Sequence, residues 1–386
     1  MKIAHVCTSS YSHKILMDKL SLLVQSGYEV HIVSSNDGYD QHLLEKFNIK
    51  PHFIKMNRKI NIKDDIISIF EMIKFFRKMR FDVVHTHTAK AGIIGRIAAK
   101  LTKTPVIIHT SHGLPFFRDQ NPFTYRMYKT FEKIGSFFCD AICSQNEEDM
   151  KALKEMAPNK LVFYEGNGVD LNKLDRRLTS ITAEDIEQLR MSLEIEQSRK
   201  IILVGARFEP VKDHDFLLKG LNILKENYQN FTCILAGDGP LKSEIIEKVQ
   251  TYNLEKHIKL VGYQKDIYPL IKLADIVSLT SIKEGIPRIL MESMACSKPI
   301  VATNVLGTRE LVLDQYTGLL VNNRDENALA NSLKYLLETP LMAINFGENG
   351  RKVIEEKYTE EMVVNRLINI YNDLMKINTK VNEGEN

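Results

Sequence analysis

The feature that most constrains the fold of this sequence is a repeated alternation of short apolar runs with amphipathic stretches of helical length. In the first half, apolar runs such as 2–7 and 106–110 alternate with helical patterns such as 62–80. Apolar runs of strand length that are separated by helices are typical of a parallel sheet buried on both faces. The other strands expected in this half are 29–34, 82–87 and 141–144.

The alternation stops once and then starts again. Residues 166–196 begin with a turn-rich segment, are polar, and show no strong strand pattern. A chain of 386 residues is also long for one hydrophobic core. We therefore expect two doubly wound, Rossmann-like α/β domains, over 1–165 and 197–357, with 166–196 as the linker. The strands expected in the second domain are 200–204, 231–236, 258–261, 276–279, 299–303 and 319–321.

Composition limits the compartment and the partners. No apolar run approaches the roughly 18–20 residues that a membrane-spanning helix needs, and the first residues form a strand pattern rather than a signal peptide. Five cysteines without a Cys-x-x-Cys pair favour a reduced, cytoplasmic compartment. Residues 1–160 contain 24 Lys and Arg against 16 Asp and Glu, a net charge of +8, whereas the remainder carries −5. A basic half of this kind often faces an anionic partner, here expected to be a membrane and not nucleic acid.

The most informative motif is 284–292, which reads Glu-Gly-Ile-Pro-Arg-Ile-Leu-Met-Glu between a predicted strand and a predicted helix. Pro287 suits the first helical position, so the amides that follow it are expected to favour an anion. Gly285 allows a ligand to approach the backbone closely. Glu284 and Glu292 flank this anion site from different depths, which suits a ligand with a phosphate end and a hydroxyl-rich end, such as a nucleotide sugar. Alternatively, they are a loop residue and a solvated helix residue at a chance spacing.

The Glu-x7-Glu spacing with Gly-x-Pro inside it resembles the signature of the retaining GT-B glycosyltransferases of family 4. The stretches 86–92 (Thr-His-Thr-Ala-Lys-Ala-Gly) and 284–288 also resemble the subgroup that builds capsular and extracellular polysaccharides. The resemblance spans nearly the whole chain. It implies two Rossmann-like domains facing a central cleft, and a C-terminal helix, here 358–377, that crosses back to the first domain. It also implies that Glu284 meets the donor sugar and that Glu292 meets the nucleotide ribose. The donor-binding residues implied by this motif are Glu284, Gly285, Ile286, Pro287, Arg288 and Glu292.

Two cations follow the first strand of the second domain. Arg207 and Lys212 stand after the run Ile-Leu-Val-Gly, and a diphosphate needs cations of this kind at its bridging and leaving oxygens. They match the family's catalytic Arg and Lys, although two surface cations would look the same. Because they can neutralise the leaving group, we expect no metal ion and no cofactor. Asp213-His-Asp215 is read as a helix N-cap at Asp213, and not as a metal-binding Asp-x-Asp motif.

Two further loops complete the predicted donor site. Gly237-Asp-Gly239-Pro follows a strand and opens a helix, which is a common tight turn but resembles the family's loop near the nucleotide. The next strand ends at Gly262 and Tyr263, where the family's base lies.

His112, followed by a glycine, ends the strand 106–110 of the first domain. Most single histidines are structural, but the resemblance implies that this one faces the donor sugar across the cleft. Its expected roles are to orient the sugar and to hold charge near the phosphate.

The acceptor site is predicted from residues in and after the expected strands 2–7 and 82–87. His85 and His87 could form part of a metal site, but no third ligand stands at a useful spacing, so strand packing and the rim of an acceptor pocket are expected. Lys90 and Arg96, with two glycines between them, suit an acceptor diphosphate. Many family members have a Gly-Gly loop after the first strand. The hydroxyls of Ser9 and Ser10, which stand there in this chain, are expected to contact the acceptor.

The segment 115–138 mixes aromatic residues with cations, as an interfacial membrane segment would. A helix that buries Phe131, Ile134 and Phe138 in the core would show the same pattern.

Together these features predict a metal-independent retaining glycosyltransferase on the cytoplasmic side of a membrane. We expect it to move a hexose or N-acetylhexosamine from a nucleotide-diphosphate sugar, UDP-linked, to an undecaprenyl-diphosphate-linked glycan. Two alternatives remain at this point, a nucleotide-sugar epimerase of the same fold and a non-catalytic sugar-nucleotide-binding subunit.

Overall fold

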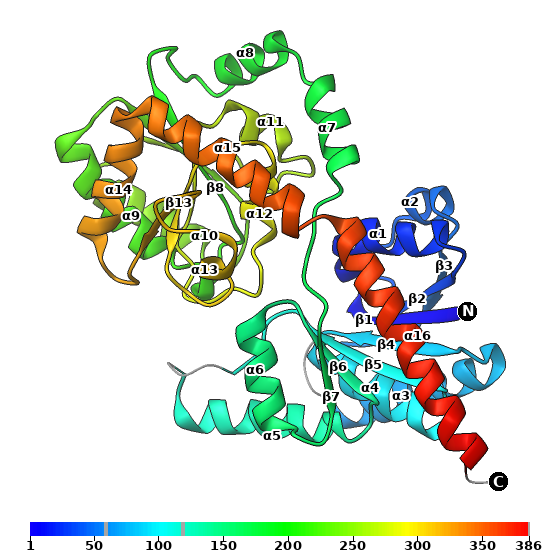
Figure 1. Cartoon of the computed structure of the whole chain (residues 1–386). Coiled ribbons are helices and arrows are strands. Elements are labelled where there is room, and N and C mark those ends of the chain that lie inside the picture. The colour runs from blue at the N-terminus through cyan, green and yellow to red at the C-terminus, as the bar shows by residue number, and fades with distance from the viewer. Residues whose placement is uncertain (58–60, 117–119, 385–386) are drawn as a thin grey trace. The chain divides into compact units, whose positions relative to one another are not determined.

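The computed structural model describes residues 1–57, 61–116 and 120–384, which form two compact units (Figure 1). The first unit is Met1–Asn167 together with the chain from Glu360 onward, and the second is Gly168–Thr359. Each unit is built around one parallel sheet, so the predicted fold of two Rossmann-like α/β units is confirmed.

The sheet of the first unit has, in the described chain, the strand order β3-β2-β1-β4-β5-β6-β7. Most of its central strands are buried, as their apolar sequences require. The short edge strands β3 and β7 escaped the sequence analysis. The strands are β1 (Lys2–Ser9), β2 (Glu29–Ser35), β3 (Lys50–Phe53), β4 (Val83–His87), β5 (Val106–Ser111), β6 (Ala141–Ser144) and β7 (Leu161–Tyr164).

Helices cover both faces of this sheet. Side-chain caps begin several of them, such as Asn61 on α3 and Asn146 on α6. On one face α4 packs against both α3 and α5, and on the other α16 lies alongside α1 (Figure 1). The helices are α1 (Ser10–Gln25), α2 (Gln41–Lys46), α3 (Ile62–Met79), α4 (Ala89–Leu101), α5 (Pro122–Ser136), α6 (Glu147–Met156) and α16 (Glu360–Gly384).

The C-terminal helix α16 buries Val364, Leu367, Ile370, Tyr371 and Leu374 in the core of the first unit. Each buried side chain of this size stabilises the fold by about 1.5–3 kcal/mol. These residues recur at helical spacing, so one side of α16 packs in this core.

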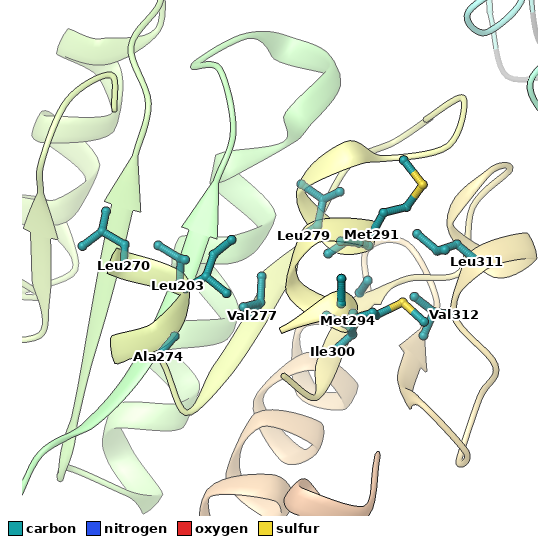
Figure 2. Close-up of a cluster of buried hydrophobic side chains, with 14 of the residues drawn as sticks. Leu203, Leu270, Ala274, Val277, Leu279, Met291, Met294, Ile300, Leu311 and Val312 are labelled. Atoms are coloured by element: carbon teal, nitrogen blue, oxygen red, sulfur yellow. The ribbon is translucent and has the colours of Figure 1, made fainter. Parts of the chain in front are cut away.

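The sheet of the second unit has, within the described residues, the order β10-β9-β8-β11-β12-β13. Figure 2 shows part of its core, where Leu203 lies beside Val277 on the sheet and Leu279 lies beside Met291 of α12. The strands are β8 (Lys200–Gly205), β9 (Phe231–Ala236), β10 (Ile258–Leu260), β11 (Ile276–Leu279), β12 (Ile300–Thr303) and β13 (Gly318–Val321). The helices are α7 (Leu171–Ser180), α8 (Ala183–Ser192), the 3₁₀ turn η1 (Pro210–Lys212), α9 (His214–Asn227), α10 (Lys242–Thr251), α11 (Tyr268–Leu273), α12 (Arg288–Ala295), α13 (Thr308–Leu311), α14 (Glu326–Glu338) and α15 (Pro340–Lys357).

The segment expected as a linker, 166–196, is mostly folded. Residues 171–192 contain α7 and α8, which belong to the second unit, and Thr182 starts α8 with a capping box. Leu174 and Ile195 lie in the core of that unit. The chain therefore passes between the units over a few residues, after Asn167 and again before Glu360.

Both sheets reverse their strand order beside their first strand. The reversal falls between β1 and β4 in the first unit and between β8 and β11 in the second. In open α/β sheets, ligands bind at the carboxyl ends of the strands that flank such a reversal. These two places are where a functional site is expected.

The cysteines and the helix lengths bear on the compartment expected from the sequence. All five cysteines are free thiols, and Cys7, Cys139, Cys143 and Cys233 are buried. Within the described ranges, no helix is both long enough and apolar enough to cross a bilayer.

Candidate functional site

Lys212 and Glu284 meet at the strand reversal of the second unit. Lys212 ends η1 in the loop after β8, and Glu284 lies in the loop after the neighbouring strand β11. The ammonium of Lys212 donates to Oε1 of Glu284, and the hydroxyl of Ser281 donates to the same oxygen at 2.5 Å. The structure thus brings together two of the predicted catalytic residues.

The two loops that carry this pair are tied to each other. The backbone N–H of Ile282 donates to the carbonyl of Val211 at 2.9 Å, and the Thr280 hydroxyl lies 3.2 Å from the carbonyl oxygens of Lys212 and Asp213. These hydrogen bonds hold the backbone segments that carry Lys212 and Glu284 beside each other at the sheet edge.

Arg207 lies in the same loop but points elsewhere. Its guanidinium pairs with Glu209 at 2.7 Å, and 60% of its side chain is exposed. Among the described residues, Arg207 is therefore paired with Glu209 and not with Lys212 or Glu284, and a contact of its guanidinium with the donor stays a prediction.

The two glycines of the predicted nucleotide loop allow its backbone to pack closely against the backbone of the loop after β8. A Cβ on Gly237 would lie 1.8 Å from the carbonyl oxygen of Ala206, and one on Gly239 would lie 2.6 Å from that of Phe208. The loop thus braces the segment that carries Arg207. Tyr263, expected near the base, is 77% exposed.

Gly307 belongs to this site although the sequence analysis missed it. It lies in the loop after β12 at φ +80°, and a Cβ there would lie 1.5 Å from the carbonyl oxygen of Gly285. The N–H of Glu284 bonds to the carbonyl of Leu306 in the same loop. No motif marked this glycine, since its role depends on a contact with a loop 22 residues earlier.

Helix α12 starts one residue later than the sequence predicted. Pro287 is its N-cap residue and not its first helical residue, and the N–H of Leu290 bonds to the Pro287 carbonyl. Arg288 Nε bonds to Oε1 of Glu292 at 2.9 Å on the same helix. The side chain of Ile286 is buried in the core, so a ligand contact from Ile286 would involve its backbone.

Asp213 is the N-cap of α9, as predicted, and its carboxylate accepts from the N–H of Phe216. Asp215 is paired with Lys219 and Lys248, at 2.8 Å each. Both carboxylates thus have structural partners, which agrees with the interpretation that Asp213-His-Asp215 is not a metal motif.

In the first unit, His112 follows β5 and is partly exposed. Its Nε2 lies 2.9 Å from Nδ1 of His87. Burial lowers the pKa of His112 to about 4, although the negative charge of Glu165 acts against this shift. His112 is therefore neutral at pH 7 in the ligand-free enzyme, and its expected role of holding charge near the phosphate stays a prediction.

His87 lies inside the first unit, within a cluster of three histidines. The sequence offered no third ligand beside His85 and His87, but the fold supplies His5 from β1. To bind zinc, the ring nitrogens must point at one metal ion from about 2.0–2.1 Å each. These rings stack instead: the ring centroids of His85 and His87 are 4.3 Å apart, and the angle between the ring planes is 30°. Their nitrogens are used in hydrogen bonds instead: His5 to His87 at 3.0 Å, and His85 to Thr110 and Tyr371.

A second set of buried hydrogen bonds connects His85, through Thr110, to the ion pair of Glu165 and Lys19. The buried Lys19 ammonium donates to Glu165, and the Thr110 hydroxyl donates to the other oxygen of that carboxylate. The Thr110 oxygen lies 2.6 Å from His85, whose other nitrogen lies 2.7 Å from the Tyr371 hydroxyl on α16. The network therefore joins α1, the sheet and α16.

The predicted acceptor residues also lie deeper than expected. The Ser9 hydroxyl donates to Asp37 at 2.6 Å, and the Ser10 hydroxyl to the Ser35 carbonyl at 2.5 Å. Lys90 pairs with Asp65 at 2.6 Å. Arg96 is fully buried in α4, on the side that faces α5, with Glu132 at 3.8 Å.

Both His87 and Arg96 are thus placed in the interior and not on the rim of an acceptor pocket. The reason is that each side chain turns inward from its element, where β4 and α4 pack against their neighbours.

Residues of α5 test the two interpretations of the segment 115–138, of which 117–119 lie outside the described residues. Phe131 and Ile134 are exposed, and the residues that α5 buries are Glu132, Gly135 and Ser136. Phe138, which follows the end of α5, is half-buried. The interpretation of this segment as a helix that buries Phe131, Ile134 and Phe138 in the core is therefore wrong for Phe131 and Ile134.

Comparison with protein families identifies the class of this protein. Residues 185–353 match the family of glycosyl transferases group 1, and residues 2–146 match the glycosyl transferase 4-like family. The chain belongs to the GT-B glycosyltransferases. Each family covers the core of one unit of this glycosyltransferase, so the family resemblance seen in its motifs is confirmed.

Relatives of this glycosyltransferase match it over nearly its full length. It is 27% identical over 385 residues to UDP-Gal:alpha-D-GlcNAc-diphosphoundecaprenol alpha-1,3-galactosyltransferase of Escherichia coli, with 97% of each chain covered. It is 26% identical over 388 residues to the capsular polysaccharide biosynthesis glycosyltransferase CapM of Staphylococcus aureus, covering 97% of this chain and 98% of CapM. The crystal structure of HepE from Anabaena in complex with UDP and glucose superposes with a TM-score of 0.82 at 20% identity, covering 97% and 100% of the two chains, which shows a common fold.

Proposed function

We propose that this enzyme transfers a hexose or N-acetylhexosamine from a UDP-linked donor to an undecaprenyl-diphosphate-linked glycan, with retention at the anomeric carbon, on the cytoplasmic face of a membrane. The E. coli relative, whose name includes UDP-Gal and a diphosphoundecaprenol-linked sugar, supports the donor and acceptor classes. The single observation that carries the proposal is the contact between Lys212 and Glu284 at the strand reversal of the second sheet.

In this reaction the acceptor hydroxyl oxygen bonds to the anomeric carbon on the face from which UDP departs. The bond from that carbon to the β-phosphate oxygen breaks with its electron pair, and the hydroxyl proton passes to the departing phosphate. Negative charge therefore accumulates on the diphosphate, and fixed cations that meet it lower the barrier.

Three groups of the second unit can meet that charge. Lys212 is fixed by the loops after β8 and β11, Arg207 can rotate away from Glu209, and the N-terminal end of α12 carries a partial positive charge beside Arg288. Glu284 then accepts from sugar hydroxyls and Glu292 from the ribose. In the proposal these groups neutralise the diphosphate without a metal ion, and His112 orients the sugar as a neutral hydrogen-bonding group.

The test is a transfer assay with a panel of UDP-sugars, a polyprenyl-diphosphate-linked GlcNAc acceptor and a metal chelator. The proposal predicts one accepted donor and an α-linked product, identified by NMR. A β-linked product contradicts retention, and activity that the chelator removes contradicts metal independence. Incubation with the donor alone separates the alternatives, because an epimerase changes the sugar without an acceptor, and a binding subunit leaves it unchanged even with one.

The first unit supports the proposed contact with an anionic membrane. On α5, Phe123 is 75% exposed, Phe131, Ile134 and the adjoining Phe137 are also exposed, and Arg126, Lys129 and Lys133 lie on the same helix. On α3, four large apolar residues are exposed as well: Ile62, Ile66, Ile67 and Phe70. Apolar side chains beside lysines and arginines suit the interface of an anionic bilayer, where a lipid-linked acceptor resides.

A further inference from the structure

The chain of histidines behind His112 has a definite direction, which follows from the partners at its two ends. Three imidazoles are joined in series: Nδ1 of His5 lies 3.0 Å from Nε2 of His87, and Nδ1 of His87 lies 2.9 Å from Nε2 of His112. In each contact one nitrogen carries the proton and the other accepts it. Because each neutral ring carries one proton, the direction of one bond fixes the direction of the next.

At the outer end of the chain, the side chain of Gln145 shares a hydrogen bond with His112. Nε2 of His112 already faces His87, which leaves Nδ1 for Gln145. The amide oxygen of Gln145 can accept from an N–H at this position. A proton on Nδ1 of His112 leaves Nε2 free to accept from His87.

The inner end is consistent with the same direction. Nε2 of His5 is buried and has no hydrogen-bond partner within the described part of the chain. A buried N–H without an acceptor is rarer in proteins than an acceptor without a donor. His5 therefore carries its proton on Nδ1, and the three rings donate in turn from His5 to His87 to His112.

The neighbouring ring, His85, has the opposite tautomer. The Glu165 carboxylate is paired with Lys19 and can only accept hydrogen bonds. The Thr110 hydroxyl therefore donates its proton to that carboxylate. The Thr110 oxygen must then accept from Nε2–H of His85, and Nδ1 of His85 accepts from the Tyr371 hydroxyl. One buried cluster thus holds two tautomers, each fixed by its partners.

We propose that His87 and His5 are positioning residues for catalysis, which hold His112 as the Nδ1–H tautomer so that it presents a hydrogen-bond donor to an oxygen of the donor sugar. The inference rests on the proposed role of His112, and His87 and His5 need not touch any substrate. Gln145 takes this N–H when no substrate is present. A sugar oxygen can replace the Gln145 oxygen without a change in the protonation of the chain.

The experiment is a histidine-selective ¹⁵N NMR spectrum of the substrate-free enzyme, with signals assigned by single His→Asn and His→Gln variants. The expected result is a protonated Nδ1 in His5, His87 and His112 and a protonated Nε2 in His85, which serves as the internal control. Protonation of His112 on Nε2 overturns the proposal. The spectrum contains no substrate, so it decides the inference whether or not sugar transfer is found.

Two substitutions at one position separate positioning from simple packing. The amide of asparagine lies near the place of Nδ1 of histidine, so His87→Asn retains a donor to His112. The amide of glutamine lies near the place of Nε2, so His87→Gln retains the contact with His5 and loses the one with His112.

The proposal expects His87→Gln to change the His112 tautomer and to lower kcat/KM about tenfold, the effect of one lost hydrogen bond. His87→Asn should keep the tautomer and recover most of that loss. Equal losses in both variants, with the His112 tautomer unchanged in both, contradict the proposal and leave His87 as a packing residue.

Discussion

The ammonium of Lys212 donates a hydrogen bond to the carboxylate of Glu284, a residue that lies 72 positions later in the chain. Each stands in the loop after one of the two strands that flank the reversal of the second sheet, β8 and β11. Lys212→Ala should lower transfer by about 100-fold, because one preorganised charge at a developing negative charge contributes on this scale.

The matched control for this variant is Lys219→Ala, which removes a lysine that pairs with Asp215 on α9 of the same unit. Its transfer rate should stay near that of the wild type. Initial rates under saturating donor and acceptor check both variants, and circular dichroism checks that they fold. Equal rates in the two variants would remove Lys212 from the mechanism.

Glycine 307 offers a prediction that involves no substrate contact. Gly307→Ala adds a Cβ where the carbonyl oxygen of Gly285 lies, at a φ of +80° that disfavours side chains. The loop that carries Glu284 must move, so we expect kcat/KM to fall at least tenfold, as small misplacements of catalytic groups do. Gly27→Ala is the control, since Gly27 has a similar φ of +87° but no atom within 4 Å of the added Cβ. A wild-type kcat/KM in Gly307→Ala would show that this loop can shift without effect.

The buried histidines predict a loss of stability in mild acid. Burial lowers the pKa of His13 from an ordinary value near 6.5 to about 4, and desolvation lowers the pKa of the partly exposed His112 to about 4 as well. Between pH 6.5 and 4 the unfolded chain binds protons that the folded unit does not, so the folded state loses stability as the pH falls through this window. Each such histidine costs about 1.4 kcal/mol per pH unit.

Hydrogen exchange of β1 and β4 peptides in urea, measured at pH 7 and pH 5, tests this dependence in the first unit. In His13→Asn, the stability of the first unit should depend less steeply on pH, by the equivalent of about one bound proton. A slope that the variant leaves unchanged would show that His13 titrates normally in the folded state.

The buried pair of Lys19 and Glu165 predicts a large effect on stability. Lys19→Met leaves the Glu165 carboxylate uncompensated in the interior, and the free energy of unfolding of the first unit should fall by about 3–5 kcal/mol. The double variant Lys19→Met/Glu165→Gln removes both charges and should recover part of the loss. Urea midpoints of the three proteins provide the measurement, and an additive loss in the double variant would mean that the charges are not coupled.

Exposed apolar residues on α5 predict membrane binding. Flotation with vesicles that contain anionic lipid at low salt should recover the wild-type enzyme in the lipid fraction, and Phe123→Ser/Ile134→Ser should remain in the aqueous fraction. Phe53→Ser, an exposed phenylalanine on β3, is the control and should float like the wild type. Failure of the wild type to float would contradict the proposed membrane contact.

Local patterns predicted much of this architecture. The buried strands and the N-cap at Asp213 each depend on residues close together in the sequence. The edge strands β3 and β7 escaped prediction because each is four residues long and contains no buried residue. The helices α7 and α8 escaped because they bury few residues: Leu174 in α7 and none in α8.

Long-range contacts explain the rest. His5 joins His85 and His87 because β1 and β4 are neighbours in the sheet, which no spacing in the sequence shows. Arg207 has its expected place after β8, but its partner is the nearby Glu209, and a sequence does not reveal which rotamer an exposed arginine adopts. The sequence pattern therefore predicted where these residues stand along the chain. The side chains that they contact could be identified only from the structure.

The central claim is that cations of the protein, chiefly Lys212, hold the diphosphate of a nucleotide sugar at the strand reversal of the second unit. Calorimetric titration of UDP in the presence of a chelator tests it most directly, with the wild type, Lys212→Ala and Lys219→Ala compared. We expect tight binding to the wild type and to Lys219→Ala, and an affinity at least tenfold weaker for Lys212→Ala. The same UDP affinity in all three proteins would contradict the claim.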